Sequence, residues 1–319
     1  MATSRETFQK LQALRGVFLG EAAGRRDDYW ANEEILESYH LFFGARIRMK
    51  WDAVLGDALT RGFAVEKSAR VVDWGCGTGV ATLALLPHRL KDLGAKCVLF
   101  DRSAAALRYA AERVAEAAPG IAIETTSKAP DVTDAIVLLS HVVNELSADA
   151  LSALVASLAN ARAVIWVEPG TPACSRAVIA VREKLRSTQA FQIVAPCTHA
   201  EACGMLAPSN ARHWCHFFGA PDPMVFRNAD WRKFSDTLKV DLRSLPTSYL
   251  VLQRAAVPPA PAPLRVVGRA RHSTGYTTVL GCAASGVSDA KRLKKHDPKE
   301  WKRLRDGDFA EYLDLRPRL

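Results

Sequence analysis

The sequence predicts an α/β protein whose core is a doubly wound, mostly parallel sheet, with an N-terminal helical layer and a cysteine-rich insertion. From Ala69 onward, short apolar runs alternate with helix-like stretches, and the runs are apolar at every position rather than at every second one. Continuously apolar strands are typical of a parallel sheet covered on both faces. A glycine-rich turn follows the first run, and sheets of this kind bind ligands at the carboxyl ends of their strands.

Residues 1–65 are expected to form a helical layer packed on the sheet. Apolar side chains in the second half of this segment recur at three- and four-residue steps, which is the spacing of one helix face. Asn32 is the expected N-cap of this helix. Arg46, Arg48 and Lys50 gather late in it, so a substrate-facing role is the alternative to simple packing.

Residues 66–257 are expected to form the sheet domain. Strands are predicted at 69–73, 96–100, 121–124, 135–139 and 163–167, and helices at 80–86, 103–117 and 148–160. The alternation stops at about 192–247, a stretch rich in Cys, His, Pro and Trp. We interpret this stretch as an insertion, because a strand pattern returns at 248–252.

Residues 258–319 are expected to form a proline linker followed by a basic C-terminal hairpin and tail. Prolines between 258 and 263 favour extended chain, and strand-like runs at 265–267 and 276–282 predict the hairpin. From residue 265 to the end there are 13 Lys and Arg against 7 Asp and Glu. Such a density of cations favours a phosphate backbone as partner, and Trp301 could stack on an unpaired base. A solvated tail is the alternative.

The composition excludes several classes of protein. No apolar run approaches 18 residues, so no membrane span is expected, and the N-terminus lacks the apolar segment of a signal peptide. The formal net charge of +9 favours a polyanionic partner. The seven cysteines are an odd number in a chain of 319 residues, which needs no disulfides to fold. We therefore expect free thiols in a reducing compartment and no disulfide-linked partner.

The candidate ligand loop is the stretch Asp73-x-Gly75-x-Gly77-x-Gly79 between a strand and a helix. Glycines permit positive φ angles and leave bare main chain against a ligand. A dinucleotide fingerprint would need its third glycine one residue later, so a nicotinamide cofactor is disfavoured. Asp101 ends the next strand, and a carboxylate there can accept two hydrogen bonds from a vicinal diol.

This pattern resembles motif I of the class I S-adenosylmethionine-dependent methyltransferases. The resemblance implies that the glycine loop passes under the amino-acid end of S-adenosylmethionine and that the second acid holds the ribose hydroxyls. The implied cofactor residues are Asp73, Gly75, Gly77, Gly79 and Asp101. The Asn/Asp-Pro-Pro-aromatic motif of many amino-methylating enzymes is absent after the fourth strand. His141 and Glu145 lie there and are candidate general bases, with a structural role as the alternative for each. No catalytic residue is assigned.

The insertion contains three cysteines within nineteen residues, Cys197, Cys203 and Cys215, and Cys282 follows at the end of a later strand. Four thiols among Pro, Gly and His predict a metal site, because a thiolate cage needs four soft donors on loops that can bend. The spacing leaves the metal open, and a histidine could replace a cysteine in a zinc site; the candidates are His199, His213 and His216. The remaining cysteines, Cys76, Cys97 and Cys174, are expected in the core.

The insertion contains Pro-Cys-x-His, then a second Cys and then Trp-Cys-His-Phe, all downstream of motif I. This pattern resembles the methyltransferase-like small-ribosomal-subunit protein family, best known as mitochondrial ribosome assembly factors with bacterial relatives. The likeness runs from roughly Glu33 to Asp308, and Thr198 and Cys203-Gly204-Met205 depart from the family's usual residues. It implies a four-iron four-sulfur cluster on Cys197, Cys203, Cys215 and Cys282.

The same resemblance implies binding to the small ribosomal subunit or its rRNA in assembly or translation, with methyl transfer as one expected activity. The alternatives are a catalytically silent RNA-binding scaffold and a zinc-stabilised RNA methyltransferase. We expect a cytoplasmic location in a bacterium, with the mitochondrial matrix less favoured.

Overall fold

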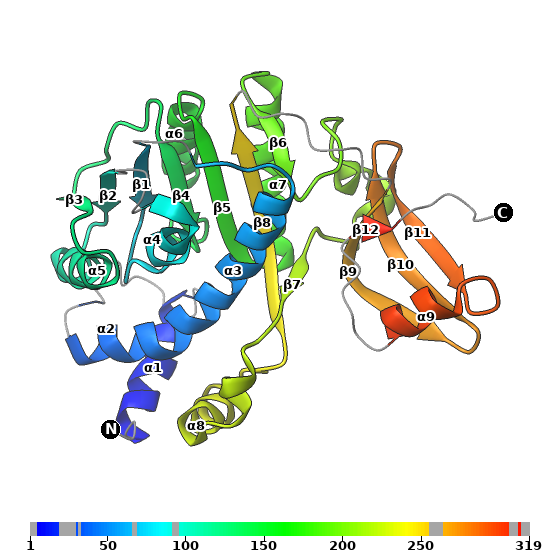
Figure 1. Cartoon of the computed structure of the whole chain (residues 1–319), viewed down its shortest axis with the longest axis horizontal. Coiled ribbons are helices and arrows are strands. Elements are labelled where there is room, and N and C mark those ends of the chain that lie inside the picture. Colours follow the sequence, from blue (N-terminus) through cyan, green and yellow to red (C-terminus); the bar gives the residue numbers. More distant parts are fainter. Residues whose placement is uncertain are drawn as a thin grey trace. The chain divides into compact units, whose positions relative to one another are not determined.

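The computed structural model describes residues 5–18, 30, 33–65, 69–90, 96–254, 264–305 and 312–313. The chain divides into two compact units, whose helices and strands are labelled in Figure 1. Unit 1 comprises Met1–Gly56, Ala64–Val167 and Gly219–Leu245, and unit 2 comprises Asp57–Phe63, Glu168–Phe218 and Pro246–Leu319. The expected cap Asn32, the prolines at 258–263 and the tail beyond residue 313 lie outside the described residues.

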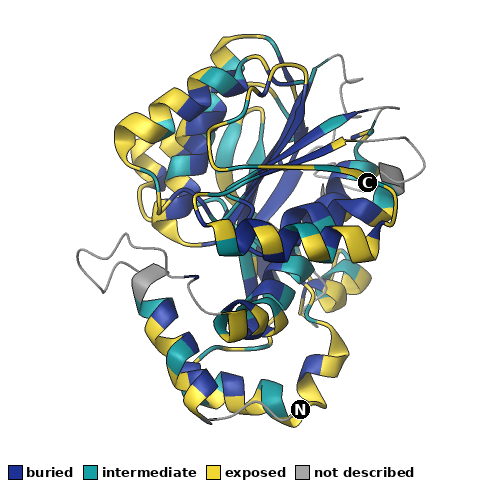
Figure 2. Cartoon of the chain, turned by 90° about the vertical axis from the view of Figure 1, so that its left-hand side faces the viewer, coloured by how far each residue is buried: buried dark blue, intermediate teal, exposed yellow. Residues whose placement is uncertain are grey.

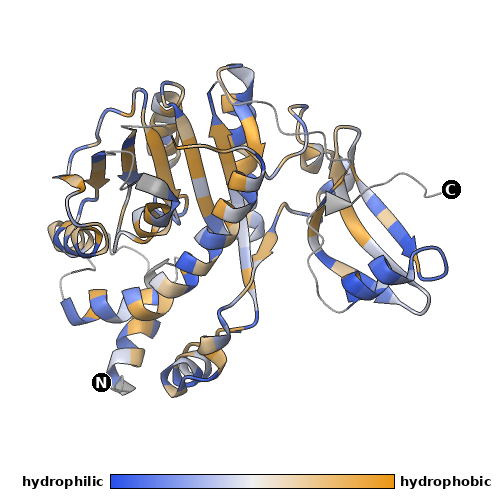
Figure 3. Ribbon diagram, viewed as in Figure 1, coloured by the Kyte–Doolittle hydropathy of each residue, from blue (hydrophilic) through white to orange (hydrophobic). Residues whose placement is uncertain are grey.

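Unit 1 contains the parallel sheet that the sequence predicts. Its strands are β1 (Arg70–Trp74), β2 (Lys96–Phe100), β3 (Ala122–Thr126), β4 (Ile136–Ser140) and β5 (Ala163–Pro169, within the unit up to Val167). They follow the order β3-β2-β1-β4-β5, and each neighbouring pair is parallel. The centres of β1, β2, β4 and β5 are buried (Figure 2), and β4 and β5 are among the most hydrophobic segments (Figure 3). The predicted mixed α/β fold with a mostly parallel sheet is therefore confirmed.

The helices that follow these strands differ in how they begin. They are α4 (Val80–Leu85) with the π-helical turn η2 (Leu86–Leu90), α5 (Ala104–Ala117) and α6 (Ala148–Leu158). Ser103 accepts a hydrogen bond from the Ala106 amide at the start of α5, and Ser147 accepts one from Ala150 at the start of α6. The helix α4 follows Gly79 without a side-chain cap. Both α4 and α5 begin shortly after the ends of β1 and β2, where a ligand site is expected.

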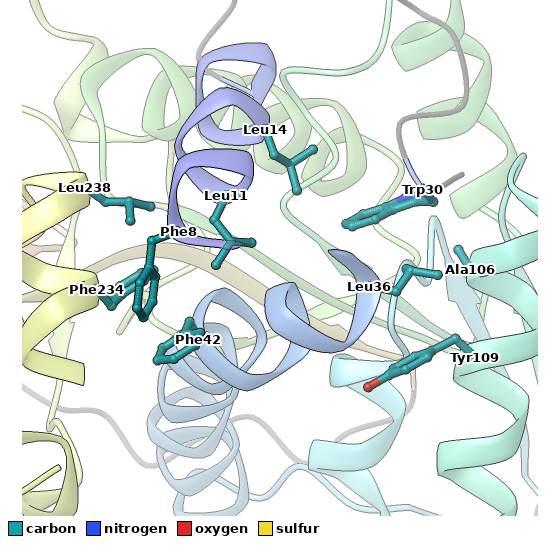
Figure 4. Packing of buried hydrophobic residues seen from close by; sticks show 10 residues of the cluster. All are labelled: Phe8, Leu11, Leu14, Trp30, Leu36, Phe42, Ala106, Tyr109, Phe234 and Leu238. Carbon is teal, nitrogen blue, oxygen red and sulfur yellow. The ribbon is translucent and has the colours of Figure 1, made fainter. Parts of the chain in front are cut away.

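The N-terminal helices form their own core with two other helices of unit 1. They are α1 (Arg5–Phe18), α2 (Glu33–Tyr39), the π-helical turn η1 (His40–Gly44) and α3 (Ala45–Thr60, within the unit up to Gly56), and they are joined by η5 (Pro223–Phe226) and α8 (Ala229–Leu238). Figure 4 shows apolar side chains of α1, α2, η1, α5 and α8 gathered in one cluster, with the Phe42 and Phe234 rings stacked 5.1 Å apart. The expected helical layer is present, but α1 and α2 pack on helices rather than directly on the sheet.

Unit 2 contains the first part of the stretch in which the predicted alternation stops, whereas residues 219–245 of that stretch belong to unit 1. The first elements of unit 2 are α7 (Pro172–Ser187), β6 (Gln192–Ala195), the short turns η3 (Gly204–Leu206) and η4 (Pro208–Asn210), β7 (Phe217–Gly219) and β8 (Leu245–Gln253). β8 pairs with β6 in the antiparallel sense and also pairs with β7. The strand expected at 248–252 is thus confirmed within β8. The helices α7 and α8 were not expected.

The C-terminal part of unit 2 is a second, antiparallel sheet. It comprises β9 (Leu264–Ser273), β10 (Tyr276–Ala283), β11 (Gly286–Leu293) and β12 (Tyr312–Leu313) in the order β11-β10-β9-β12, with helix α9 (Pro298–Arg305) packed on it. The expected hairpin corresponds to β9 and β10, but the expectation of a tail was wrong for β11 and α9. None of the helices in the described residues is long and apolar enough to cross a membrane.

Candidate functional site

The glycine loop between β1 and α4 has the left-handed backbone that its sequence predicts. The φ angles of Gly75, Gly77 and Gly79 are 71°, 49° and 75°. The amides of Gly75 and Cys76 both donate to the Phe100 carbonyl oxygen, at 2.8 and 2.9 Å. These two bonds fix the loop to the end of β2, beside Asp101.

The three glycines are needed for different reasons. A Cβ on Gly75 would lie 2.9 Å from Cγ1 of Val142, and one on Gly79 would lie 3.2 Å from Cβ of Ala110. These two positions therefore exclude side chains because the protein itself packs there. A Cβ on Gly77 would meet no heavy atom within 4 Å. The space at Gly77 is open, which is what a ligand lying on bare main chain requires.

Asp101 joins the loop to the next helix. One carboxylate oxygen accepts from the Gly77 amide and the other accepts from the Ser103 amide, both at 2.9 Å. Each oxygen has a second lone pair, so both can accept a further hydrogen bond. The side chain is only partly buried.

Asp73 lies below the loop and is fully buried. Its Oδ2 accepts from the hydroxyl of Thr82 at 2.8 Å and from the Thr82 amide at 3.2 Å. Within the described part of the chain its Oδ1 has no partner, and neither has the buried hydroxyl of Thr78. Burial raises the pKa of Asp73 to about 6, and the charge of Asp101 adds to the rise. Asp73 therefore holds the start of α4, and a direct contact with a cofactor stays a prediction.

The end of β4 carries a strained histidine. His141 has a φ of 59°, which is rare for a residue with a side chain and costs about 1–3 kcal/mol. Its Nε2 is buried and without a partner in the described residues. Burial, with the charge of Lys50 as the second cause, lowers the pKa of His141 well below its usual value. The imidazole is therefore neutral at pH 7. The other candidate base, Glu145, is exposed to solvent.

The late basic residues of the N-terminal helices have structural roles. Arg46 donates to the Ser244 carbonyl at 3.0 Å, and Arg48 donates to the Leu83 carbonyl at 3.1 Å and to Asp52 at 2.8 Å. Lys50 is buried. These contacts favour packing over the substrate-facing alternative.

The structure brings together the four cysteines that the sequence singles out, all in unit 2. Cys203, Cys215 and Cys282 pack around a small apolar core of Ile179, Met205 and Val267. Burial raises the pKa of the Cys215 thiol, and the charges of Cys197, Cys282 and Cys203 add to this rise. Burial also raises the pKa of Cys282 to about 12, with contributions from Cys197 and Cys203. The four thiols therefore lie close enough to influence one another.

Three arginines surround these thiols, and the sequence reasoning missed all of them. Arg182 on α7 donates from Nε to Sγ of Cys197 at 3.2 Å. Arg61 donates to the Cys197 carbonyl at 2.9 Å. Arg265 stands opposite Cys282 in the β9–β10 pairing. A signal for Arg182 was present, because it is a charged residue on the apolar face of a helix, where charges are rarely buried without a partner.

No metal site is evident in the described residues, since no group of three or more His, Cys, Asp or Glu there is placed to hold an ion. The metal-binding character predicted for the insertion is therefore not shown. His199 lies near the thiols, with Nε2 at 3.6 Å from Sγ of Cys282. The other three cysteines, Cys76, Cys97 and Cys174, are buried as expected.

The basic C-terminal sheet places Trp301 differently from the expectation. The Lys294 ammonium and the Arg305 guanidinium each lie 4.9 Å from the centre of the Trp301 ring. The ring is therefore engaged by cations of its own chain. Stacking of Trp301 on a nucleobase is not the arrangement that this structure favours.

Several solved structures similar to the chain are described as methyltransferases. Magnesium protoporphyrin IX methyltransferase of Synechocystis PCC 6803, with bound S-adenosylmethionine, is 13% identical at a TM-score of 0.38, over 80% of this chain and 100% of that one. A methyltransferase of Geobacter sulfurreducens with S-adenosylhomocysteine is 12% identical at a TM-score of 0.38, over 80% and 100%. A methyltransferase of Aquifex aeolicus is 16% identical at a TM-score of 0.34, over 48% of this chain and 86% of that one. Likenesses this low carry no argument about the present chain.

No curated protein matches the chain. A family model matches residues 62–313, which include the glycine loop, Asp101 and all four clustered cysteines. That model is described as mitochondrial small ribosomal subunit Rsm22, and because it spans most of the 319 residues, the chain belongs to the Rsm22 family.

Proposed function

We propose that the chain binds S-adenosylmethionine at the glycine loop and acts on the small ribosomal subunit or its rRNA as a methyltransferase-like factor. The observation that carries the cofactor assignment is the open space at Gly77. The backbone of Gly77 is left-handed, and its amide donates to the Asp101 carboxylate. The partner is supported by the family, whose description names the small ribosomal subunit.

The polar groups around the loop fit this cofactor. The two oxygens of Asp101 keep lone pairs for the two hydroxyls of a ribose. Oδ1 of Asp73 and the hydroxyl of Thr78 are unpartnered in the described residues and can meet the charged groups of an amino acid. When bound, S-adenosylmethionine supplies an activated methyl group. The neutral His141 imidazole can accept a hydrogen bond from the group that receives this methyl group.

Titration calorimetry of the full chain with S-adenosylmethionine tests the cofactor assignment. Asp101→Ala removes two charge-assisted hydrogen bonds to the ribose and should weaken binding by about 1.5–3 kcal/mol. Asp52→Ala is the matched control, because Asp52 is an exposed acid of the same unit that pairs with Arg48. Equal affinities of the Asp101 and Asp52 variants would contradict the role given to Asp101.

Methyl transfer is distinguished from a scaffold role by transfer of tritium from labelled S-adenosylmethionine to immature small subunits. Gly77→Asp protein is the comparison, because an acid at that position fills the open space and repels the cofactor's carboxylate. Counts above this comparison would support an enzyme. Counts equal to it, together with impaired subunit maturation after deletion of the protein, would leave the scaffold as the function.

We also propose that Cys197, Cys203, Cys215 and Cys282 hold an iron–sulfur cluster. Four thiols that lie close together form a donor set suited to such a cluster, and the nearby guanidinium groups of Arg182 and Arg265 offset its negative charge. The resemblance of the cysteine motif supports the same assignment. Zinc remains the alternative.

Metal analysis of anaerobically purified protein tests this second proposal. We expect iron and acid-labile sulfide in stoichiometric amounts, and both should be lost in Cys197→Ser but retained in Cys174→Ser, which changes a buried cysteine outside the cluster. Stoichiometric zinc without sulfide would replace the iron–sulfur assignment with zinc. Absence of any bound metal would refute both.

A further inference from the structure

We propose that the cavity between the β9–β10 turn and the start of α9 binds one unpaired nucleotide of a single-stranded RNA. This inference rests on the RNA-related partner of the proposed function and names a specific site for it. The cavity has a volume of about 430 Å³ and is lined by Gly275, Leu293, Lys294, Lys295 and Pro298. Its volume lies within the range of small-molecule sites, about 300–1,000 Å³.

The lining combines an apolar surface with cations. Leu293 is 37% exposed, one of the large hydrophobic side chains left accessible to solvent, and Pro298 adds a second apolar surface. The amide of Lys294 donates to the Gly275 carbonyl at 2.9 Å, so the β9–β10 turn and the end of β11 are held together around the cavity. Lys294 and Lys295 are exposed at the same place. A flat apolar base with an attached phosphate matches this combination.

The cations around the cavity have no carboxylate partner. In the described part of the chain, no carboxylate forms a salt bridge with Lys294, Lys295, Lys299 or Lys302, although the Lys294 ammonium also lies against the Trp301 ring. Glu300 accepts from Arg292 at 2.8 Å and pairs with Arg303 at 3.7 Å, and Asp297 accepts from the Glu300 amide at 2.9 Å. The surface of β11 and α9 therefore keeps a net positive charge, which favours the phosphates on either side of a bound nucleotide.

Trp301 explains why the base would enter the cavity rather than stack beside it. Lys294 and Arg305 each lie 4.9 Å from the centre of the Trp301 ring. The aromatic ring therefore positions Lys294 at the cavity instead of offering itself to a base. A base-paired RNA cannot place a base in the cavity without unpairing it, whereas a single strand can.

The test measures binding of a labelled single-stranded RNA and of an RNA hairpin of equal length to the full chain by fluorescence anisotropy. We expect the wild-type protein to prefer the single strand. Leu293→Gln removes the apolar surface of the cavity without changing charge and should weaken single-strand binding at least about fivefold while leaving hairpin binding unchanged. A double variant, Lys294→Gln with Lys295→Gln, should weaken single-strand binding more than the Leu293 variant does and should reduce the salt dependence of that binding.

Lys302→Gln is the matched control, because it removes one exposed lysine of α9 that does not line the cavity. It should lower both affinities slightly and equally. Circular dichroism of Leu293→Gln establishes that the variant is folded, and the double lysine variant gives a second measurement if it is not.

Equal loss of single-strand and hairpin binding in Leu293→Gln, unchanged single-strand binding in that variant, or wild-type protein without preference for the single strand would overturn the cavity as a nucleotide site and leave a sequence-blind polyanion surface. Failure of the wild-type protein to bind either RNA would instead refute the RNA-binding part of the proposed function.

Discussion

Nε of Arg182 lies 3.2 Å from Sγ of Cys197, and Nη2 of the same guanidinium donates to the carbonyl oxygens of His199 at 3.1 Å and Glu201 at 2.9 Å. Arg182 is buried, so these bonds replace the water that its charge would otherwise keep. One side chain on α7 thus fixes the loop that carries the first two clustered cysteines.

Arg182→Lys should therefore destabilise unit 2. A lysine keeps the charge but cannot reach three acceptors in the fixed directions of a guanidinium, so at least one partly buried carbonyl oxygen loses its donor, at about 1–3 kcal/mol. Denaturant unfolding measures the loss. Arg186 lies one turn along the same helix and its guanidinium pairs with Glu183, so Arg186→Lys should change stability by less than about 0.5 kcal/mol. Equal effects of the two substitutions would refute the role of Arg182.

Asp73 should make stability fall as the pH rises. The pKa of Asp73 is about 6 in the folded chain and 3.8 for an ordinary aspartate, so the folded state binds more protons between these values. The contribution of Asp73 is fully favourable below about pH 4 and is lost as the pH rises through 6, with a limit of about 3 kcal/mol at 1.36 kcal/mol per pKa unit.

Asp73→Asn removes this titration and keeps an acceptor oxygen for Thr82. The variant should match the wild type near pH 4 and exceed its free energy of unfolding near pH 7.5, as measured by urea titration at both values. The affinity of the variant for S-adenosylmethionine should fall. A buried carboxylate that lowers stability is typical of a group retained for function. Parallel stability curves of the two proteins would show that the pKa of Asp73 is not raised.

The buried group Asp57, Tyr249 and Arg265 should be a main source of stability in unit 2. The Tyr249 hydroxyl donates to Asp57 at 2.5 Å and accepts from Arg265 at 2.7 Å. Tyr249→Phe leaves both charged partners one hydrogen bond short and should cost about 1–3 kcal/mol. Arg265→Met leaves the Asp57 carboxylate buried without its cation and should cost about 3–5 kcal/mol. Denaturant unfolding checks both, with Tyr276→Phe as the control, and a cost for Tyr249→Phe no greater than that of the control would refute the network.

The parallel sheet of unit 1 could be predicted because its strands are buried and continuously apolar. The strands found at 70–74, 96–100, 136–140 and 163–169 begin within one residue of the expected positions. The strand β11 was missed because Ser288 and Asp289, which lie on opposite faces of the strand, are both polar and exposed, so no apolar run marks it. Its pairing with β10 supplies what its own sequence does not.

The start of α7 had a signal in the sequence that the predicted elements do not use. Thr171 caps the helix and Pro172 occupies its first position. Tertiary contacts that depend on side-chain direction could not be predicted at all. The bond from Arg182 to Cys197 joins residues 15 apart across a helix and a loop, and no spacing rule connects them.

The cofactor loop, by contrast, could be predicted from spacing alone, since its three glycines all adopt the positive φ that motif I requires. What the sequence left out is the difference among them, because only the fold shows that Gly77 faces open space. That difference gives the most direct test of the account.

The decisive measurement is the affinity of Gly77→Ala for S-adenosylmethionine, by titration calorimetry, compared with Gly120→Ala. Both glycines are left-handed, with φ of 49° and 87°, and a Cβ on either meets no heavy atom within 4 Å, so the two substitutions carry similar backbone strain in the same unit. We predict wild-type affinity for Gly120→Ala and at least about a tenfold loss for Gly77→Ala, because its methyl group occupies the space of the ligand. Equal affinities of the two variants, or no heat of binding with the wild-type protein, would contradict the account.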